Sequence, residues 1–259
     1  MTLDGIVDTL RAAGCVFAEE EAAVLRSVAS GAGLDALVAA RAAGAPLEHL
    51  VGWVEFAGLR VAVGPGVFVP RRRTELLVDQ VVAAAPTVVV ELFCGAAAVA
   101  AAVAAALPSA EVHAADVSPE ALVHARLNLR ADRVHGGDLD AGLPPDLRGR
   151  VDVLVANAPY VPTGAIATMP PEARDHEPRA ALDGGADGLD HHRRLAARAP
   201  RWLRPGGLLV VETSRGQAAG TAAAMVGFAT TVVRDDDRDA TAVVGRLTSG
   251  ASPPPRSST

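Results

Sequence analysis

From Thr74 onward, short runs of β-branched residues alternate with helical stretches, and this alternation restricts the possible folds more than any other feature of the chain. Two parallel strands need a long crossover, usually a helix, so repeated β-α-β order indicates a parallel sheet with right-handed connections. The expected strands are residues 87–93, 111–117, 133–139, 151–157 and 208–213. The sequence therefore predicts an α/β fold with a mostly parallel sheet.

The last part of the chain departs from this alternation. Two further β-branched runs, at 231–234 and 241–244, are separated by the acidic segment from Asp235 to Asp239. A short polar connection joins antiparallel strands, so we expect a hairpin that completes a sheet of seven strands. Residues 250–259 are rich in Pro and Ser and are expected to form a disordered tail.

The first 50 residues show helical rather than strand spacing. The apolar residues that recur on one face are Ile6, Leu10 and Ala13, then Ala22, Leu25 and Val28, then Leu34, Leu37 and Val38. This spacing predicts a small helical domain over residues 1–50. Residues 51–73 contain two short strand-like runs around Ala57-Gly58, which predict a β-hairpin linker to a main domain at 74–249.

Charge and targeting signals limit the possible partners. The chain has 24 Lys and Arg against 30 Asp and Glu, a net charge of -6, so a nucleic acid is an unlikely partner. The cluster Arg71-Arg72-Arg73 is more typical of a solvated turn or a small-anion contact than of a groove reader. No stretch has the pattern of a signal peptide or a membrane span, so we expect a cytoplasmic protein with no membrane partner.

The two cysteines, Cys15 and Cys94, match no metal-ligand or redox spacing. Free thiols in a reducing compartment are the expected state. No metal is expected.

Open α/β sheets bind ligands at the carboxyl ends of their strands, so the residues that follow each strand are the first candidates for function. After the first expected strand, the run from Glu91 to Ala98 forms a turn of small residues at which bare backbone can approach a ligand. A tight turn that lets the helix pack closely explains this run equally well.

The second and third strands also end in candidate residues. Asp116 stands 21 positions after Gly95, close to the offset of about 20 expected of a ribose-binding acid, which favours an adenosine ligand. Asp116 also precedes a helix start, where Ser118 is the expected cap that leaves Asp116 free. Asp138 and Leu139 lie where an adenine edge could bind, although Asp138 alone is more typical of a solvated turn.

The fourth strand is followed by Asn157-Ala158-Pro159-Tyr160, the most specific local signal. An amide nitrogen is a poor nucleophile because its lone pair is delocalised, and two acceptors for its N–H groups would hold it in a fixed geometry. The Asn157 side-chain oxygen and the Ala158 carbonyl are candidate acceptors. Pro159 stiffens the turn, and Tyr160 offers a flat wall for a planar amide. The alternative is a simple turn with a core tyrosine.

Further motifs extend over residues 47–244. They are Phe68-Val69-Pro70-Arg71 with Thr74-Glu75, the loop at 93–97, Asp116, Asn157-Ala158-Pro159-Tyr160, Glu177-Pro178-Arg179, Leu182-Asp183-Gly184-Gly185, Asp187-Gly188-Leu189-Asp190 and Leu203-Arg204-Pro205-Gly206-Gly207. With these motifs the chain closely resembles the protein-(glutamine-N5) methyltransferases, which methylate the glutamine of peptide-chain release factors. The segment 177–190 is the most specific part, because general fold physics does not demand it.

The resemblance implies a Rossmann-like S-adenosylmethionine-dependent methyltransferase sheet, with S-adenosyl-L-methionine as cofactor and a protein with an exposed glutamine as partner. Asn157 and Tyr160 are the candidate catalytic residues, within a substrate-binding set of Asn157, Ala158, Pro159 and Tyr160. The candidate cofactor-binding residues are Phe68, Arg71, Glu91, Phe93, Cys94, Gly95, Ala96, Ala97, Asp116, Asp138, Leu139 and Asn157.

The chain departs from the family pattern in three places. The family has glycines at the positions of Phe93, Gly95 and Ala97, so we expect the Phe93 and Ala97 side chains to approach the cofactor. Ala158 replaces the first proline of the acceptor motif but keeps the carbonyl. The amino-terminal helical region, which helps to recognise the protein substrate in this family, is short.

Two alternative functions follow from the same residues. Methylation of an exocyclic amine of adenine needs the same two acceptors and a stacking tyrosine, but the net charge argues against it. A catalytically silent relative could also bind a partner through the inherited fold without using the cofactor.

Overall fold

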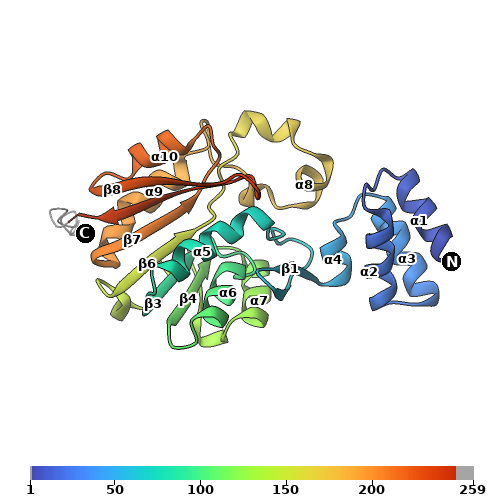
Figure 1. Cartoon of the computed structure of the whole chain (residues 1–259), viewed down its shortest axis with the longest axis horizontal. Helices are drawn as coiled ribbons and strands as arrows, with labels where there is room; N and C mark the ends of the chain where they lie inside the picture. The colour runs from blue at the N-terminus through green and yellow to red at the C-terminus, as the bar shows by residue number, and fades with distance from the viewer. Residues whose placement is uncertain (1, 249–259) are drawn as a thin grey trace.

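The computed structural model describes residues 2–248, without the side chains of residues 171–173 (Figure 1). The tail predicted at 250–259 lies outside the described residues. Within the described part of the chain, no helix has both the length and the apolar character needed to cross a membrane.

Four helices occupy the amino-terminal region, at one end of the molecule (Figure 1). They are α1 (Leu3–Ala12), α2 (Ala18–Val28), α3 (Gly31–Ala42) and α4 (Leu47–Val51). Their own apolar cluster contains Ile6, Leu10, Ala18, Ala22, Leu25, Leu34 and Val38. The expected inward positions of Ala13 and Val28 are wrong: both are exposed, because each lies at a helix end where the apolar face no longer meets a neighbour.

A two-stranded antiparallel hairpin follows, with β1 (Trp53–Phe56) and β2 (Leu59–Ala62). Its turn residues, Ala57 and Gly58, both have positive φ, as a two-residue hairpin turn with the twist of the strands requires.

The main sheet has seven strands in the order β5-β4-β3-β6-β7-β9-β8. The strands are β3 (Val88–Leu92), β4 (Glu111–Asp116), β5 (Val134–Gly136), β6 (Val151–Ala156), β7 (Leu203–Glu212), β8 (Phe228–Asp235) and β9 (Ala240–Leu247). Strands β3 to β7 run parallel, and β9 pairs antiparallel with both β7 and β8. The predicted fold class is therefore confirmed, including the terminal hairpin.

Strand β7 begins at Leu203, five residues before the expected start at 208. Leu203 pairs with Val151, and the register then shifts before Val153 pairs with Leu208. The intervening segment contains Pro205 and two glycines, which weaken the strand pattern in the sequence. The strand begins as early as Leu203 because this residue pairs with β6, and such pairing cannot be recognised from the local sequence.

Helices cover both faces of the sheet (Figure 1). On one face, α5 (Glu75–Ala83), α6 (Ala98–Ala106) and α7 (Pro119–Asn128) contribute to a core with Val89, Val153 and Val210. On the other, α9 (Asp190–Arg198) and α10 (Ala218–Ala224) pack on Val90, Leu154 and Leu209. The remaining short helices are η1 (Arg72–Thr74), η2 (Ala131–Arg133), η3 (Pro145–Leu147), η4 (Thr163–Thr168), α8 (Pro171–His176), η5 (Arg179–Ala181) and η6 (Ala199–Arg201).

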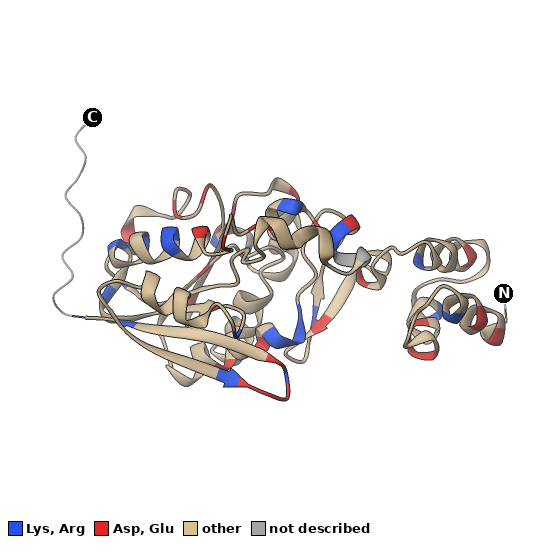
Figure 2. Cartoon of the chain, turned by 90° about the horizontal axis from the view of Figure 1, so that it is seen from above, with Lys and Arg blue, Asp and Glu red and all other residues tan. Residues whose placement is uncertain are grey.

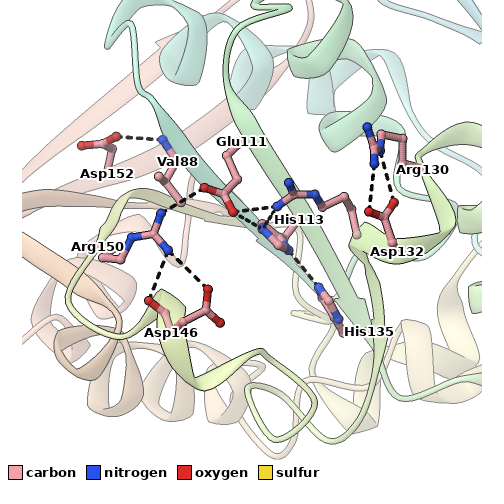
Figure 3. A network of polar contacts seen from close by, with 10 residues as sticks. Val88, Glu111, His113, Arg130, Asp132, His135, Asp146, Arg150 and Asp152 are labelled. Carbon is pink, nitrogen blue, oxygen red and sulfur yellow. Dashed lines mark hydrogen bonds and ion pairs between the residues drawn. The ribbon is translucent and has the colours of Figure 1, made fainter.

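A polar network lies at the amino-terminal end of β4 and beside the edge strand β5 (Figure 3). Glu111, the first residue of β4, accepts hydrogen bonds from Arg133, at 2.6 Å, and from Arg150, at 3.1 Å. His113 contacts Glu111 and stacks on His135. Hydrogen bonds from His113 and Arg133 lower the pKa of Glu111 to about 2. This network ties β4, β5 and the loop that carries Arg150 together.

A buried histidine predicts how stability depends on pH. His192, on the buried face of α9, is 2% exposed, and burial followed by the neighbouring His191 and Arg193 lowers its pKa to about 4. Its pKa in the unfolded chain is near 6.5, so its contribution is present above pH 6.5 and is lost as the pH falls toward 4. We expect this proton uptake to destabilise the folded protein by about 2 kcal/mol at pH 5.

The measurement is urea unfolding of the native protein and of His192→Gln at pH 7.5 and pH 5. The variant should lose less stability over this interval, whereas the exposed His176→Gln should behave as the native protein does. An equal loss in native protein and His192→Gln would assign the acid sensitivity to other groups.

Candidate functional site

A cavity of about 610 Å³ opens where the carboxyl ends of β3, β4 and β6 meet the segments before α5 and before α9. Strand order changes direction at β3, whose neighbours β4 and β6 lead to opposite edges of the sheet. Such a switch point separates the loops and leaves a crevice for ligands. The volume lies within the range of small-molecule sites.

All candidate site residues except Ala97 and Leu139 line this cavity. The lining ones are Phe68, Arg71, Glu91, Phe93, Cys94, Gly95, Ala96, Asp116, Asp138, Asn157, Ala158, Pro159 and Tyr160. Ala97 and Leu139 are instead buried in the two apolar cores that flank the sheet. The expected approach of the Ala97 side chain to a ligand is therefore wrong, because its methyl group points into the core beneath α6.

Three positions of the loop after β3 have a backbone conformation that suits glycine. Phe93, Gly95 and Ala97 have φ values of 56°, 53° and 59°, in the left-handed region that glycine adopts without strain. A Cβ added at Gly95 would meet none of the described atoms within 4 Å. Phe93 lines the cavity, and its ring packs edge-on against His191 with centroids 5.1 Å apart. Two of these three left-handed positions thus carry a side chain.

Glu91, at the end of β3, is only 3% exposed and anchors the helix that follows. Its Oε2 accepts a hydrogen bond from the Ala100 amide at 2.7 Å. Burial raises the pKa of Glu91 to about 8, so the carboxyl is mostly protonated at pH 7. Burial likewise raises the pKa of the neighbouring Cys94 thiol, which is then a poor nucleophile.

Asp116, at the end of β4, organises two loops. Its Oδ2 accepts from the Gly95 amide at 2.8 Å and its Oδ1 from the Ser118 amide at 2.9 Å. Ser118 caps α7 by accepting from the Ala121 amide, so the predicted cap is confirmed, but Asp116 is not free of partners. Each carboxylate oxygen keeps a second acceptor position, which can face a ligand in the cavity.

Asp138 and Leu139, after β5, have different surroundings. The Asp138 carboxylate is exposed and forms an ion pair with Arg194 at 2.6 Å. Leu139 is 6% exposed and has a φ of 58°, so its side chain turns inward while Asp138 stays at the cavity rim.

Asn157 follows β6 directly and has a fixed side chain. Its Nδ2 donates to the Thr74 hydroxyl oxygen at 3.2 Å, and Thr74 is buried at the end of η1. This contact uses the donor end of the amide and leaves Oδ1 available to accept. Residues 83 positions apart in the chain thus set the direction of the Asn157 oxygen.

Tyr160 is held at both its hydroxyl and its backbone. The hydroxyl donates to Glu212 Oε1 at 3.2 Å, and the backbone carbonyl accepts from Gln217 Nε2 at 2.8 Å. Burial and the neighbouring Glu212 raise the pKa of Tyr160 to about 12, so the phenol stays protonated at neutral pH.

The segment 177–190 packs directly on the Tyr160 backbone. A Cβ at Gly184 would lie 2.8 Å from Tyr160 Cα, and one at Gly188 would lie 2.3 Å from Tyr160 O. Both distances are too short for any side chain. Glycine at these positions therefore lets the loop close over the acceptor motif.

Glu177 fixes the other wall of the cavity. Its Oε1 accepts from Arg71 at 2.6 Å and from the Val69 amide at 3.2 Å, and its Oε2 has no hydrogen-bond partner among the described residues. Burial raises the pKa of Glu177, and Arg71 opposes this effect. The segment from Phe68 to Arg71 is thus tied to a loop more than 100 positions away.

Sequence reasoning assigned no role to Glu212 or Gln217, and it interpreted Arg73 only as part of a solvated turn or a small-anion contact. Arg73 lines the cavity and donates to Glu212 at 3.1 Å. Glu212 is the last residue of β7, so a search for polar residues at the carboxyl end of every strand would have identified it. Among the side chains that the structure describes, no group of three or more His, Cys, Asp or Glu residues could hold a metal ion.

Comparison with known proteins gives consistent matches. Residues 58–170 match the family model of the methyltransferase small domain. A release factor glutamine methyltransferase of Streptomyces coelicolor is 43% identical over 213 residues, which are 75% of this chain and 76% of that protein. One from Geobacter sulfurreducens is 40% identical, over 70% of this chain and 65% of that protein.

The fold also matches solved structures. The crystal structure of a methyltransferase from Pyrococcus furiosus aligns with a TM-score of 0.55 at 17% identity, and the match covers 74% of this chain and 90% of that one. At this identity the likeness shows a shared fold.

Proposed function

Because the chain belongs to the release factor glutamine methyltransferase family, we propose that it transfers a methyl group from S-adenosyl-L-methionine to the side-chain amide nitrogen of a glutamine in a protein. The observation that carries this proposal is the fixed amide of Asn157. Thr74 occupies its donor end, so its oxygen is the end that can accept an N–H from an acceptor amide. Tyr160 stands three residues later, at the cavity wall.

The cavity fits the cofactor in size and in chemistry. Gly95 leaves open space beside the loop after β3, and a bulky ligand can approach the backbone there. Glu177 has a buried oxygen without a hydrogen-bond partner, and Asp116 has acceptor positions left on both oxygens. Carboxylate oxygens of this kind suit ribose hydroxyls and the positive charges of S-adenosyl-L-methionine.

The proposed binding roles follow from these positions. Asp116 would hold the ribose hydroxyls, the segment from Phe68 to Arg71 would contact the methionine half, and the Gly95 loop would approach the carboxylate side. Phe93 and Asp138 would lie near the adenine. When bound, the cofactor supplies a methyl group already activated by its sulfonium charge.

The protein's contribution to the chemistry is placement and exclusion of water. Asn157 Oδ1 accepts one N–H of the acceptor amide, and the Ala158 carbonyl is the proposed second acceptor. The Tyr160 ring limits the tilt of the amide plane. Pro159 fixes the turn between these groups, so the acceptor nitrogen is presented in one orientation. No metal or strong base is needed, since the nitrogen becomes acidic once it is methylated.

The substrate and the domain roles are part of the proposal. The relatives are named for release factors, so a peptide-chain release factor is the candidate substrate and would place the protein in the cytoplasm. Residues 1–50 would then recognise the substrate, and residues 74–249 would form the methyltransferase domain. Residues 51–73 would be the linker between these two domains. The separate apolar cluster of the first helices supports this division.

The test is transfer to a purified release factor. We expect mass spectrometry to find one added methyl group on a glutamine side chain, and a glutamine-to-asparagine change in the acceptor should abolish it. The shorter side chain withdraws the amide from the methyl donor. Methylation of adenine in a nucleic acid, or no transfer despite measured cofactor binding, would reject the proposed function in favour of the alternatives.

A further inference from the structure

A charged residue lies buried directly behind the wall of the cavity. Glu212 is 2% exposed at the carboxyl end of β7 and does not line the cavity itself. Its Oε1 receives hydrogen bonds from the Tyr160 hydroxyl, at 3.2 Å, and from Arg73 Nε, at 3.1 Å. A buried carboxylate is expensive unless it is paired, so this arrangement needs both partners.

The contacts of Glu212 converge on the acceptor motif. Tyr160 and Arg73 both line the cavity, and Arg73 immediately precedes Thr74, which holds Asn157. The short turn at Arg73 and Thr74 therefore contacts both sides of the acceptor motif. Thr74 accepts from Asn157, and Arg73 bonds Glu212, which in turn accepts from the Tyr160 hydroxyl.

The Tyr160 backbone is already fixed by Gln217 and by the close approach of Gly184 and Gly188. What the backbone contacts leave free is the first side-chain torsion, which swings the far end of the ring between staggered positions. A hydrogen bond at the hydroxyl, the atom farthest from the backbone, restrains this swing best, because the hydroxyl moves most when the first torsion changes.

We propose that Glu212 is a positioning residue for methyl transfer: its buried carboxylate, paired with Arg73, fixes the Tyr160 hydroxyl and thereby the position of the ring beside the acceptor amide. The kinetic consequence of this inference rests on the proposed function, whereas the restraint of Tyr160 by Glu212 is independent of it. Tyr160 is the only tyrosine of the chain, so optical and NMR signals of tyrosine report this residue alone.

The structural part is tested without any substrate. Burial and the Glu212 carboxylate raise the pKa of Tyr160 to about 12. Glu212→Gln removes the charge beside the phenol, so this variant should have a lower tyrosine pKa. At pH 10.5 we expect about 3% tyrosinate in the native protein, from absorbance at 295 nm, and at least threefold more in Glu212→Gln. Circular dichroism at the same pH verifies that both are folded.

The matched control is Glu111→Gln, which removes a carboxylate that also bonds an arginine but lies at the opposite end of the sheet (Figure 3). It should leave the tyrosine signal unchanged. If either protein unfolds at pH 10.5, the ¹³Cζ resonance of labelled tyrosine at pH 7 gives the same comparison. An identical tyrosine signal in native protein and Glu212→Gln overturns the proposal.

The kinetic part uses a double-mutant cycle. Glu212→Gln should lower kcat about tenfold and leave the Kd of S-adenosyl-L-methionine within about twofold, because the ring is misplaced while the cofactor contacts remain. If Glu212 acts through the hydroxyl, Glu212→Gln should cause little further loss in a Tyr160→Phe background. Independent, multiplicative losses would show that Glu212 does not act through Tyr160.

The two hypotheses fail in different ways. If the native protein binds cofactor but methylates no glutamine, the proposed function is wrong while the tyrosine signal still decides whether Glu212 holds the ring. If the native protein is active and the kcat losses of Glu212→Gln and Tyr160→Phe are independent, the proposed function stands and the positioning role of Glu212 is wrong.

Discussion

We expect replacement of Asn157 by alanine to lower kcat about a hundredfold and to change the Kd of S-adenosyl-L-methionine by less than about threefold. In the proposed mechanism the side-chain oxygen of Asn157 accepts a bond that strengthens as the acceptor nitrogen becomes pyramidal, so its loss should affect turnover more than ground-state binding. Steady-state kinetics with a release factor give kcat and KM, and isothermal titration gives the cofactor Kd.

Two further variants identify which end of the Asn157 amide matters. Asn157→Asp keeps an acceptor oxygen, so it should retain more activity than Asn157→Ala if acceptance is the role. Thr74→Val removes the contact that directs the amide, at 3.2 Å, and should lower kcat less than Asn157→Ala does. Full turnover of Asn157→Ala with cofactor bound would show that Asn157 is only a turn residue.

The second large effect is expected at Asp116. Asp116→Ala should weaken cofactor binding by about 1 to 3 kcal/mol, because an ionised acceptor to the ribose hydroxyls is lost. The same carboxylate also holds the Gly95 and Ser118 amides, so part of the loss comes from the two loops. Isothermal titration with S-adenosyl-L-methionine measures the sum.

Asp116→Asn separates the two contributions, since it keeps an acceptor for one backbone amide but removes the charge. We expect it to bind more tightly than Asp116→Ala and more weakly than the native protein. Asp132→Ala, which removes an exposed carboxylate paired with Arg130, is the control and should bind as the native protein does (Figure 3). Unchanged affinity in a folded Asp116→Ala would reject the ribose role.

Both effects arise in a small part of the molecule. Charged residues are spread over the helices and loops around the sheet (Figure 2), whereas Asp116 and Asn157 lie in one cavity at the ends of two parallel strands. The strands that carry them both flank β3, and this adjacency brings residues 41 positions apart in the chain into one site.

Much of the fold was determined by local sequence. Alternating strand and helix patterns predicted the parallel strands and the terminal hairpin, because side-chain periodicity and crossover length are properties of short segments. The same reasoning placed Asp116 and Asn157 at strand ends, which a parallel sheet brings to a common edge. The cap at Ser118 is local as well, since its partner lies three residues away.

Only the tertiary structure decided how the site is held together. Arg73 and Glu212 are 139 positions apart, and Thr74 and Asn157 are 83 apart, so no local pattern relates them. Likewise, Ala97 and Leu139 were expected at the ligand, but their side chains lie in the two cores, whereas Phe93, with the same left-handed backbone, lines the cavity. Periodicity indicates which type of element forms and which of its faces is apolar. The direction of a side chain in a turn, and the partner it meets, depend on packing between distant segments.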